Sequence, residues 1–259
     1  MLDFITNIAK KAGEIILSEK RHLVVEKKSP REIVTNADIS AQKFINSSIL
    51  SRFPDHDILG EESYDKEKDY SKSADLWLVD PIDGTTNFAQ GFSEYCISIG
   101  YYQNFKPLLG VVFFPEKNLL FTAVTTRGAY RDGKKIQSSI KKDIKNAVIG
   151  GLFSYEIEKN LTTFDIAKKL YPRIKTMRFM GSSVMDLCFT AAGILDGMFG
   201  LSLKPWDMGA GVLIAKEAGA TVSKPDGGDW NLFQPQILIA NKYIHSQLVP
   251  IFRSAVVLP

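Results

Sequence analysis

The sequence predicts an α/β protein, with an α+β arrangement in its first half and an α/β arrangement in its second half. In the first half, two helical patterns precede a run of strand-like segments, whereas after about residue 140 short apolar strands alternate with helical segments. The 259 residues, of which 45% are hydrophobic and 24% charged, are sufficient for a substantial core. We therefore divide the chain into an α+β half, residues 1–140, and an α/β half, residues 141–259.

The elements of the first half follow from the spacing of apolar residues. They are, in order, a helix over 3–19, a short strand at 24–26, a helix from about 38 to 50, and strands at 57–63, 76–79, 96–102, 108–114 and 119–124. Apolar residues recur at helical spacing in the helices, and β-branched and aromatic residues between Asn and Pro mark the strands. Arg131-Asp132-Gly133-Lys134 is a tight hairpin signal, so the strands are expected to form a mostly antiparallel sheet.

The second half shows strands and helices in alternation. Strands are expected at 147–151, 176–180, 198–201, 220–223 and 237–240, and helices at 156–170, 183–192, 207–218 and near 245–252. Asp207 is expected to be the N-cap of its helix, because aspartate is favoured at that position. This alternation is typical of layered α/β folds.

Composition and charge limit the partners of the chain. The formal net charge is only +3 and the lysine pairs are scattered, so we do not expect nucleic-acid binding. Cys96 and Cys188 lie in apolar segments and are interpreted as reduced core residues of a cytoplasmic protein, with a disulfide between them as the alternative. The N-terminus lacks the pattern of a signal peptide, and the apolar run 109–114 is too short to span a membrane.

The stretch Asp80-Pro81-Ile82-Asp83-Gly84-Thr85-Thr86-Asn87-Phe88 carries the strongest chemical signal. The apolar run 76–79 leads into two carboxylates three residues apart, followed by a glycine and two hydroxyls. Carboxylate oxygens suit Mg²⁺, and backbone N–H groups at the turn into a helix suit a phosphate. The stretch therefore predicts a metal-dependent phosphatase.

Three further acids are expected at the ends of elements that line a cleft: Asp38, Glu61 and Asp207. Taken alone, Asp38 is as well explained by a helix-capping role, and of the adjacent Glu61 and Glu62 only one can face a shared site if both lie on a strand. Carboxylate ligands without His or Cys favour Mg²⁺ or Mn²⁺. None of the three histidines lies beside a motif, which argues against a histidine-based phosphatase.

Three segments together resemble the inositol monophosphatase family, within the lithium-sensitive, Mg²⁺-dependent phosphatase superfamily. They are Gly60-Glu61-Glu62-Ser63, the stretch from Trp77 to Phe88, and Trp206-Asp207 with the glycine and alanine residues that follow. The resemblance covers nearly the whole chain. It implies a layered αβαβα sandwich, and it implies a homodimer, because family members are commonly dimeric.

The resemblance also implies a set of metal ligands. Glu61, Asp80 and the carbonyl of Ile82 would hold one Mg²⁺, and Asp80, Asp83 and Asp207 would hold a second. A third, weaker ion would lie on Glu61 and water.

The remaining site residues implied by the resemblance concern water and substrate. Thr85 would pair with Asp38 to orient and deprotonate the attacking water. The N–H groups of Gly84 and Thr85 would bind the phosphate, and Gly181-Ser182-Ser183 would contact the alcohol portion of the substrate.

One position departs from the pattern of the inositol-specific members. They usually carry a glutamate seven residues before the Trp-Asp aspartate, where this chain has Gly200. A site that lacks this partner discriminates less well for the substrate hydroxyls. We expect a phosphomonoesterase acting on a small sugar or polyol phosphate, with inositol-1-phosphate as the first choice. Fructose-1,6-bisphosphatase, 3′-phosphoadenosine phosphatase and histidinol-phosphate phosphatase are the enzymatic alternatives, and a phosphometabolite- or RNA-associated regulatory module is the non-enzymatic one.

Overall fold

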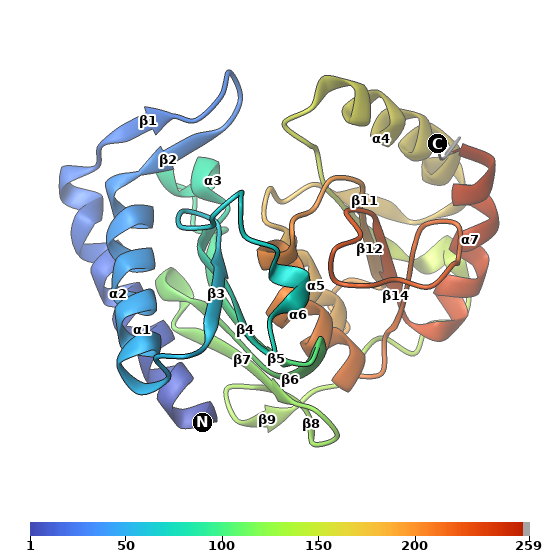
Figure 1. The fold of residues 1–259 in the computed structure, drawn as a ribbon. Coiled ribbons are helices and arrows are strands. Elements are labelled where there is room, and N and C mark those ends of the chain that lie inside the picture. The colour runs from blue at the N-terminus through green and yellow to red at the C-terminus, as the bar shows by residue number, and fades with distance from the viewer. Residues whose placement is uncertain (256–259) are drawn as a thin grey trace.

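Five layers, in the order α–β–α–β–α, make up the computed structural model, which describes residues 1–255 (Figure 1). The outer layers are the helix pairs α1 (Leu2–Glu19) with α2 (Asn36–Arg52), and α4 (Ile157–Leu170) with α7 (Lys242–Ala255). Helices α5 (Ser183–Ala191) and α6 (Pro205–Glu217) lie between the two sheets. The predicted layered sandwich is confirmed.

The larger sheet has seven strands in the order β3-β4-β5-β6-β7-β8-β9. They are β3 (Asp57–Gly60), β4 (Asp75–Asp83), β5 (Cys96–Gln103), β6 (Lys106–Phe114), β7 (Leu119–Val124), β8 (Gly128–Arg131) and β9 (Lys134–Lys135). All neighbours pair antiparallel except β3 and β4, and β8 and β9 form the predicted hairpin. The pairing of β4 with β5 shifts between Asp80 and Asp83, so a bulge interrupts the regular alternation of side chains at these two acids.

The second sheet has five strands in the order β11-β10-β12-β14-β13. They are β10 (Val148–Gly151), β11 (Thr176–Arg178), β12 (Gly197–Gly200), β13 (Thr221–Ser223) and β14 (Ile237–Ala240). Strands β10, β11 and β12 are parallel, as the alternation of strands and helices predicts, and β14 pairs antiparallel with both β12 and the edge strand β13. A separate hairpin joins β1 (Val25–Lys27) to β2 (Ile33–Thr35), and the short helix α3 (Thr85–Ala89) follows β4.

Helix α6 packs unusually close to the seven-stranded sheet because glycines face it. A Cβ atom at Gly100 or Gly110 would lie 3.0 or 2.8 Å from the backbone of Gly209 or Ala210. The second half of the chain thereby places α6, with Asp207 in its first turn, directly on the sheet of the first half. The two sheets share the α5–α6 layer as a common core, although the chain passes from one sheet to the other near residue 140.

Two element boundaries differ from the sequence-based expectation and change the description of site residues. Helix α6 begins at Pro205, whose fixed φ suits a first helical position, so Asp207 is the third helical residue and the N-cap prediction is wrong. Strand β3 ends at Gly60, so Glu61 and Glu62 lie in a turn and the strand alternation does not apply to them.

Two further expectations concern the chain as a whole. Cys96 and Cys188 are free and buried, as predicted. Within residues 1–255, no helix has both the length and the apolar composition that a membrane span requires.

Candidate active site

A cleft of about 740 Å³ opens at the end of β4, between the two halves of the chain. The site residues named from the sequence that line it are Glu61, Asp80, Ile82, Asp83, Gly84, Thr85, Gly181, Ser183 and Asp207. Asp38 and Ser182 are buried behind this lining, where Asp38 contacts Thr85 and Ser182 contacts Asp83. The fold therefore gathers into one place residues that are up to about 170 positions apart.

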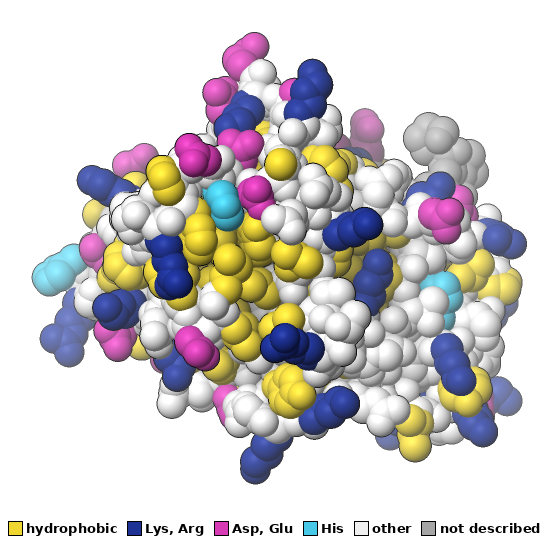
Figure 2. All heavy atoms as spheres, turned by 60° about the horizontal axis from the view of Figure 1, so that its bottom comes forward, with side chains coloured by type: hydrophobic (Ala, Val, Ile, Leu, Met, Phe, Trp, Pro, Cys, Tyr) yellow, Lys and Arg dark blue, Asp and Glu magenta, His cyan; other side chains and the backbone are white. Residues whose placement is uncertain are grey.

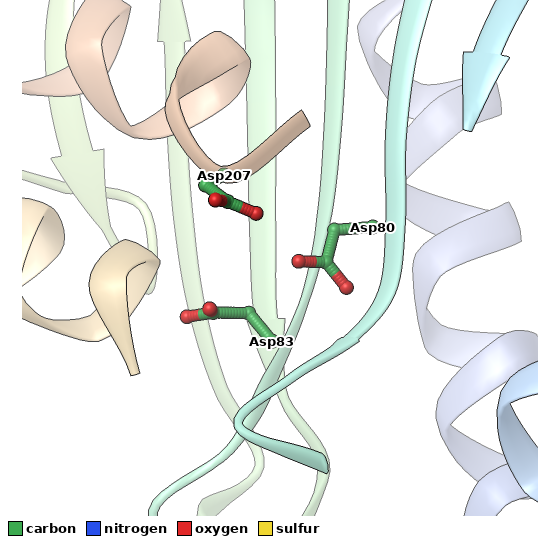
Figure 3. A group of neighbouring side chains, drawn as sticks. All are labelled: Asp80, Asp83 and Asp207. Atoms are coloured by element: carbon green, nitrogen blue, oxygen red, sulfur yellow. The ribbon is translucent and has the colours of Figure 1, made fainter. Parts of the chain in front are cut away.

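Three aspartates converge on the floor of the cleft (Figure 3). Asp80 and Asp83 come from the end of β4, and Asp207 comes from the first turn of α6; one carboxylate oxygen of each lies within 4.8 Å of the others. Asp80 is 1% exposed, and its Oδ1 atom is buried with no hydrogen-bond partner. A buried carboxylate oxygen without a donor, surrounded by two other carboxylates, is the arrangement that a hard cation stabilises.

The electrostatics of these aspartates agree with a cation site. Burial raises the pKa of Asp80 well above its usual value, and the charges of Glu61, Asp83 and Asp207 raise it further. Burial and the charge of Asp83 likewise raise the pKa of Asp207. Keeping these carboxylates ionised therefore costs free energy unless a positive charge is present. All the donors are oxygens, which fits Mg²⁺ or Mn²⁺.

The start of helix α5 holds the Asp83 carboxylate in place. The Ser182 hydroxyl and the Val184 N–H donate to Oδ2, the latter at 2.8 Å, and the Ser183 hydroxyl donates to Oδ1 at 3.1 Å. Burial raises the pKa of Asp83, while these hydrogen bonds oppose that effect. The structure thus gives Ser182 a contact with a proposed metal ligand, and Gly181 and Ser183 are the members of the stretch that line the cleft.

Thr85 and Asp38 are in contact beside this cluster. The Thr85 hydroxyl lies 3.2 Å from Asp38 Oδ1 and 2.9 Å from the carbonyl oxygen of Ile82, so it donates its proton to one of them. Thr35 is the N-cap residue of α2, and its backbone N–H donates a hydrogen bond of 2.8 Å to Asp38 Oδ2. Burial raises the pKa of Asp38 to about 6, partly offset by the hydrogen bonds from Thr35. Asp38 therefore caps the helix with one oxygen and meets Thr85 with the other.

Glu61 and Glu62 both line the cleft, in contrast to the expectation that only one could face it. The ammonium group of Lys28, from the β1–β2 turn, lies 2.9 Å from Glu61 Oε1 and 2.5 Å from Glu62 Oε1. Burial and the charge of Glu61 raise the pKa of Glu62 to about 7. Burial alone would lower the pKa of Lys28, but the two glutamates raise it above its usual range. Sequence reasoning missed Lys28 because no pattern in chain order links it to residues more than thirty positions away.

Gly84, Gly181 and Asn87 lie where the turn after β4 meets the segment before α5. Gly84 has φ +98°, and a Cβ there would lie 2.9 Å from the carbonyl oxygen of Glu94, so only glycine fits. Gly181 has φ +74° and lies beside Asn87, whose amide donates to the carbonyls of Glu94 and Met180 at 2.7 Å. Asn87 thus fastens the turn after β4 to the segment before α5, a role that its position in the motif did not reveal.

Gly200 ends β12 and does not line the cleft, whereas Leu203 does. A Cβ at Gly200 would lie 2.8 Å from Leu203 Cδ1, so a larger side chain there requires Leu203 to move.

Known proteins match this chain over nearly its whole length. The model of the inositol monophosphatase family matches residues 1–256. Inositol monophosphatase 3 of Solanum lycopersicum is 34% identical over 256 residues, covering 96% of this chain and 94% of that protein. The Nus factor SuhB of Vibrio cholerae is 37% identical over 235 residues, covering 88% of this chain and 86% of that protein. Among solved structures, the Thermotoga maritima IMPase TM1415 superposes with a TM-score of 0.89 at 30% identity, covering 98% of this chain and 97% of the other.

Proposed function

The chain belongs to the inositol monophosphatase family of phosphoric monoester hydrolases, and we propose that it is a Mg²⁺-dependent phosphatase of a small sugar or polyol phosphate. The observation that carries this proposal is the convergence of Asp80, Asp83 and Asp207 within 4.8 Å, with a buried and unpartnered oxygen on Asp80. Inositol-1-phosphate is the substrate proposed first.

The proposed metal ligands are the carboxylates of Glu61, Asp80, Asp83 and Asp207 and the carbonyl of Ile82. Together they would hold two or three Mg²⁺ ions, or Mn²⁺ in their place. Bound divalent cations supply activation of water and neutralise charge on the leaving oxygen of a phosphate ester. Lys28 holds Glu61 in the cleft at 2.9 Å and balances part of the negative charge of Glu61 and Glu62.

Thr85 and Asp38 are the proposed acid–base pair. The Thr85 hydroxyl lies at the cleft surface and reaches Asp38 Oδ1, so it can orient the attacking water and pass a proton toward that oxygen. A pKa of about 6 leaves Asp38 mostly ionised at neutral pH and still basic enough to accept a proton. Its second oxygen is fixed by Thr35, which keeps Oδ1 directed at Thr85.

The substrate is proposed to lie across the same cleft. The N–H groups of Gly84 and Thr85 would bind the phosphate, since both residues line the cleft beside the aspartates. Gly181 and Ser183 would contact the alcohol portion, while Ser182 acts on the site through Asp83.

The experiment that tests this function measures phosphate release by the purified protein. The panel contains inositol-1-phosphate, fructose-1,6-bisphosphate, 3′-phosphoadenosine 5′-phosphate and histidinol phosphate, each with Mg²⁺ and with a chelator. We expect Mg²⁺-dependent turnover, fastest with the inositol ester. No turnover on the panel, or turnover that chelation leaves unchanged, contradicts the proposal.

Gly200 is proposed to relax the selectivity for inositol phosphates. Gly200→Glu should shift kcat/KM toward inositol-1-phosphate relative to fructose-1,6-bisphosphate. Because the new side chain meets Leu203, the same change is also made with Leu203→Ala, which frees the space. If neither variant changes the ratio of the two substrates, this interpretation of Gly200 is wrong.

An RNA-associated role is the second candidate function, because several relatives, the Vibrio cholerae protein among them, are named Nus factor SuhB. Affinity for RNA that falls steeply with salt and that survives Asp83→Asn would support it. The net charge of +3 is small and the lysine pairs are scattered along the sequence, which favours the phosphatase.

Assembly as a homodimer and a cytoplasmic location complete the proposal. The ring of Phe153 stacks on that of Phe179 and lies tilted against that of Phe164, which is on α4. The three side chains are nevertheless 48%, 57% and 39% exposed, in the order Phe153, Phe164 and Phe179. Such a patch suits an interface with a second copy, and light scattering of the purified protein should give the mass of a dimer. The two free cysteines are in keeping with a reducing compartment.

A further inference from the structure

The second half of the chain forms the wall of the cleft that faces the metal-binding acids of the first half. This wall consists of the β10–α4 loop, residues 152–156, and of residues 202–204, which follow β12. Burial and the charges of Glu61 and Glu32, which lie on the other wall, raise the pKa of Tyr155 in the loop. The loop therefore faces the acids of the first half across the cleft.

The cleft differs in character from the opposite side of the molecule. Figure 2 views the lower side of Figure 1, where hydrophobic side chains lie across the centre of the face. The cleft lies at the upper side of Figure 1, between the β1–β2 hairpin and the start of α4, and charged residues from both halves of the chain line it. A ligand of the cleft is therefore expected to be hydrophilic.

Glu156 alone brings a carboxylate to the cleft from the β10–α4 loop and residues 202–204. It is the N-cap residue of α4, but its side chain does not cap the helix. Its Oε1 atom instead accepts hydrogen bonds from the Ser202 hydroxyl at 3.0 Å and from the Lys159 ammonium group at 2.8 Å. Among residues 1–255, its Oε2 atom accepts no hydrogen bond. One oxygen is thus fixed, and the other can accept a hydrogen bond from a ligand.

Contacts within the β10–α4 loop hold the backbone beside this carboxylate. The Asn160 side chain is buried; its oxygen accepts from the Ser154 N–H at 2.6 Å, and its amide donates to the Ser154 carbonyl at 2.8 Å. The Ser154 hydroxyl in turn accepts from the Glu156 N–H at 3.0 Å. Because the loop is already ordered, less conformational entropy is lost when a ligand binds to Glu156.

The charge of Glu156 is already balanced, which decides the kind of group that it can bind. Hydrogen bonds from Lys159 and Ser202 lower its pKa, so the carboxylate is ionised at neutral pH. Because Lys159 supplies the positive charge, a second cation gains little, whereas an uncharged O–H still gains a charge-assisted hydrogen bond. The phosphate is proposed to lie at Gly84 and Thr85, so the hydroxyl groups of the alcohol portion extend toward this wall.

We propose that Glu156 binds the hydroxyl groups of the alcohol portion and so selects polyol and sugar phosphates over phosphate esters without hydroxyls. This inference rests on the proposed phosphatase function and adds a specificity-determining residue to it. The neighbouring strand β12 supplies no polar side chain here, because Leu203 and Leu152 occupy the space 2.8 and 3.4 Å from a Cβ atom at Gly200. A cleft that hydrogen-bonds the hydroxyls of its substrate discriminates against esters that lack them.

Kinetics with inositol-1-phosphate and with propyl phosphate, which has no hydroxyl group, test this assignment. Glu156→Gln keeps the shape and removes the charge. It should raise KM for inositol-1-phosphate about tenfold, the loss for one charge-assisted hydrogen bond, with kcat and both constants for propyl phosphate unchanged. Glu158→Gln is the matched control, because Glu158 lies in the first turn of the same helix but does not line the cleft. Exposed ion pairs contribute little to stability, so the urea midpoint should not change in either variant.

Calorimetry with phosphonate analogues separates a failure of this inference from a failure of the phosphatase proposal. In these analogues a CH₂ group replaces the ester oxygen, so binding is measured with Mg²⁺ and without hydrolysis. Glu156→Gln should bind the inositol analogue about tenfold more weakly than the wild type, whereas both should bind butylphosphonate equally. A wild type without turnover contradicts the phosphatase proposal, while the analogues still test Glu156. Equal affinity of wild type and Glu156→Gln for the inositol analogue, no binding of it by the wild type, or the same loss in Glu158→Gln or for butylphosphonate overturns the inference.

Discussion

Replacing Asp80 by asparagine tests whether the aspartate cluster is built for a cation at the expense of stability. Asp83 and Asp207 each place an oxygen within 4.8 Å of the Asp80 carboxylate, whose Oδ1 has no donor. Two ionised carboxylates at 4.8 Å repel by about 3.5 kcal/mol at an effective dielectric constant of about 20. Partial protonation reduces this cost, so Asp80→Asn should raise the free energy of unfolding in a chelator by about 1–3 kcal/mol.

The same substitution should abolish the stabilisation that Mg²⁺ gives. A ligand at about 100 times its dissociation constant stabilises the folded state by about 2.7 kcal/mol. Urea unfolding of the wild type and of Asp80→Asn, each in a chelator and in saturating Mg²⁺, measures both effects. The wild type should gain stability from Mg²⁺. The variant should have the higher free energy of unfolding in the chelator and gain little from Mg²⁺. A variant that is less stable in the chelator, or that responds to Mg²⁺ as the wild type does, refutes the reasoning.

Asp186→Asn is the matched control for this experiment. Asp186 is also fully buried and neither of its oxygens has a partner, but it does not line the cleft. Burial raises its pKa, so the folded state binds the proton more tightly and stability is lost as pH rises above the unfolded value. Above the unfolded-state pKa, the free energy of unfolding of the variant should therefore rise relative to that of the wild type by about 1.4 kcal/mol per pH unit. The variant should keep the full stabilisation by Mg²⁺.

Three further predictions concern single side chains. Thr85→Val removes the hydroxyl that meets Asp38 and should lower kcat about 100-fold or more with the Mg²⁺ response retained, as measured by phosphate release. Ser182→Ala removes a donor to Asp83 and should weaken Mg²⁺ binding about 10- to 100-fold, as measured by calorimetry. Burial lowers the pKa of His245, so its contribution to stability is present above about pH 6.5 and is lost as pH falls; His245→Gln should flatten this part of the urea midpoint curve.

Each of these predictions has a specific contradicting outcome. Thr85→Ser keeps the hydroxyl and should retain much of the activity, so equal losses in both variants would argue against a role for the hydroxyl. Ser202→Ala, at the rim of the same cleft, should leave Mg²⁺ affinity unchanged. From pH 7.5 to pH 5.5, the urea midpoint of the wild type should fall further than that of His245→Gln. An equal change in both proteins would show that the fold does not hold His245 neutral.

The order and type of the elements could be predicted from local patterns. Period and turn chemistry predicted each strand of the antiparallel sheet and the alternation that follows, because both depend on residues close in the chain. Strand β2 (Ile33–Thr35) was not predicted, and the other errors occurred at boundaries. Pro205 starts α6 two residues before Asp207, and β3 ends before Glu61, so capping and strand rules were applied to residues that they do not govern.

By itself, the sequence determined the composition of the site. The acids of the stretch from Asp80 to Asp83, the glycine and threonine after them, and the aspartate after Trp206 all proved to line one cleft. These residues were recognisable because hard-cation ligands and tight turns require particular residue types at fixed short spacings.

Only the tertiary structure decided how those residues are held and what surrounds them. Ser182 and Val184 fix Asp83 across about a hundred positions of sequence, Lys28 pairs with the glutamates of a different turn, and Trp230 is left with an unpartnered donor. None of these contacts has a local signature. They depend on how segments far apart in the chain pack together: glycines in β5 and β6 let α6 approach the first sheet closely, for example, and Gly211 lets α5 approach α6.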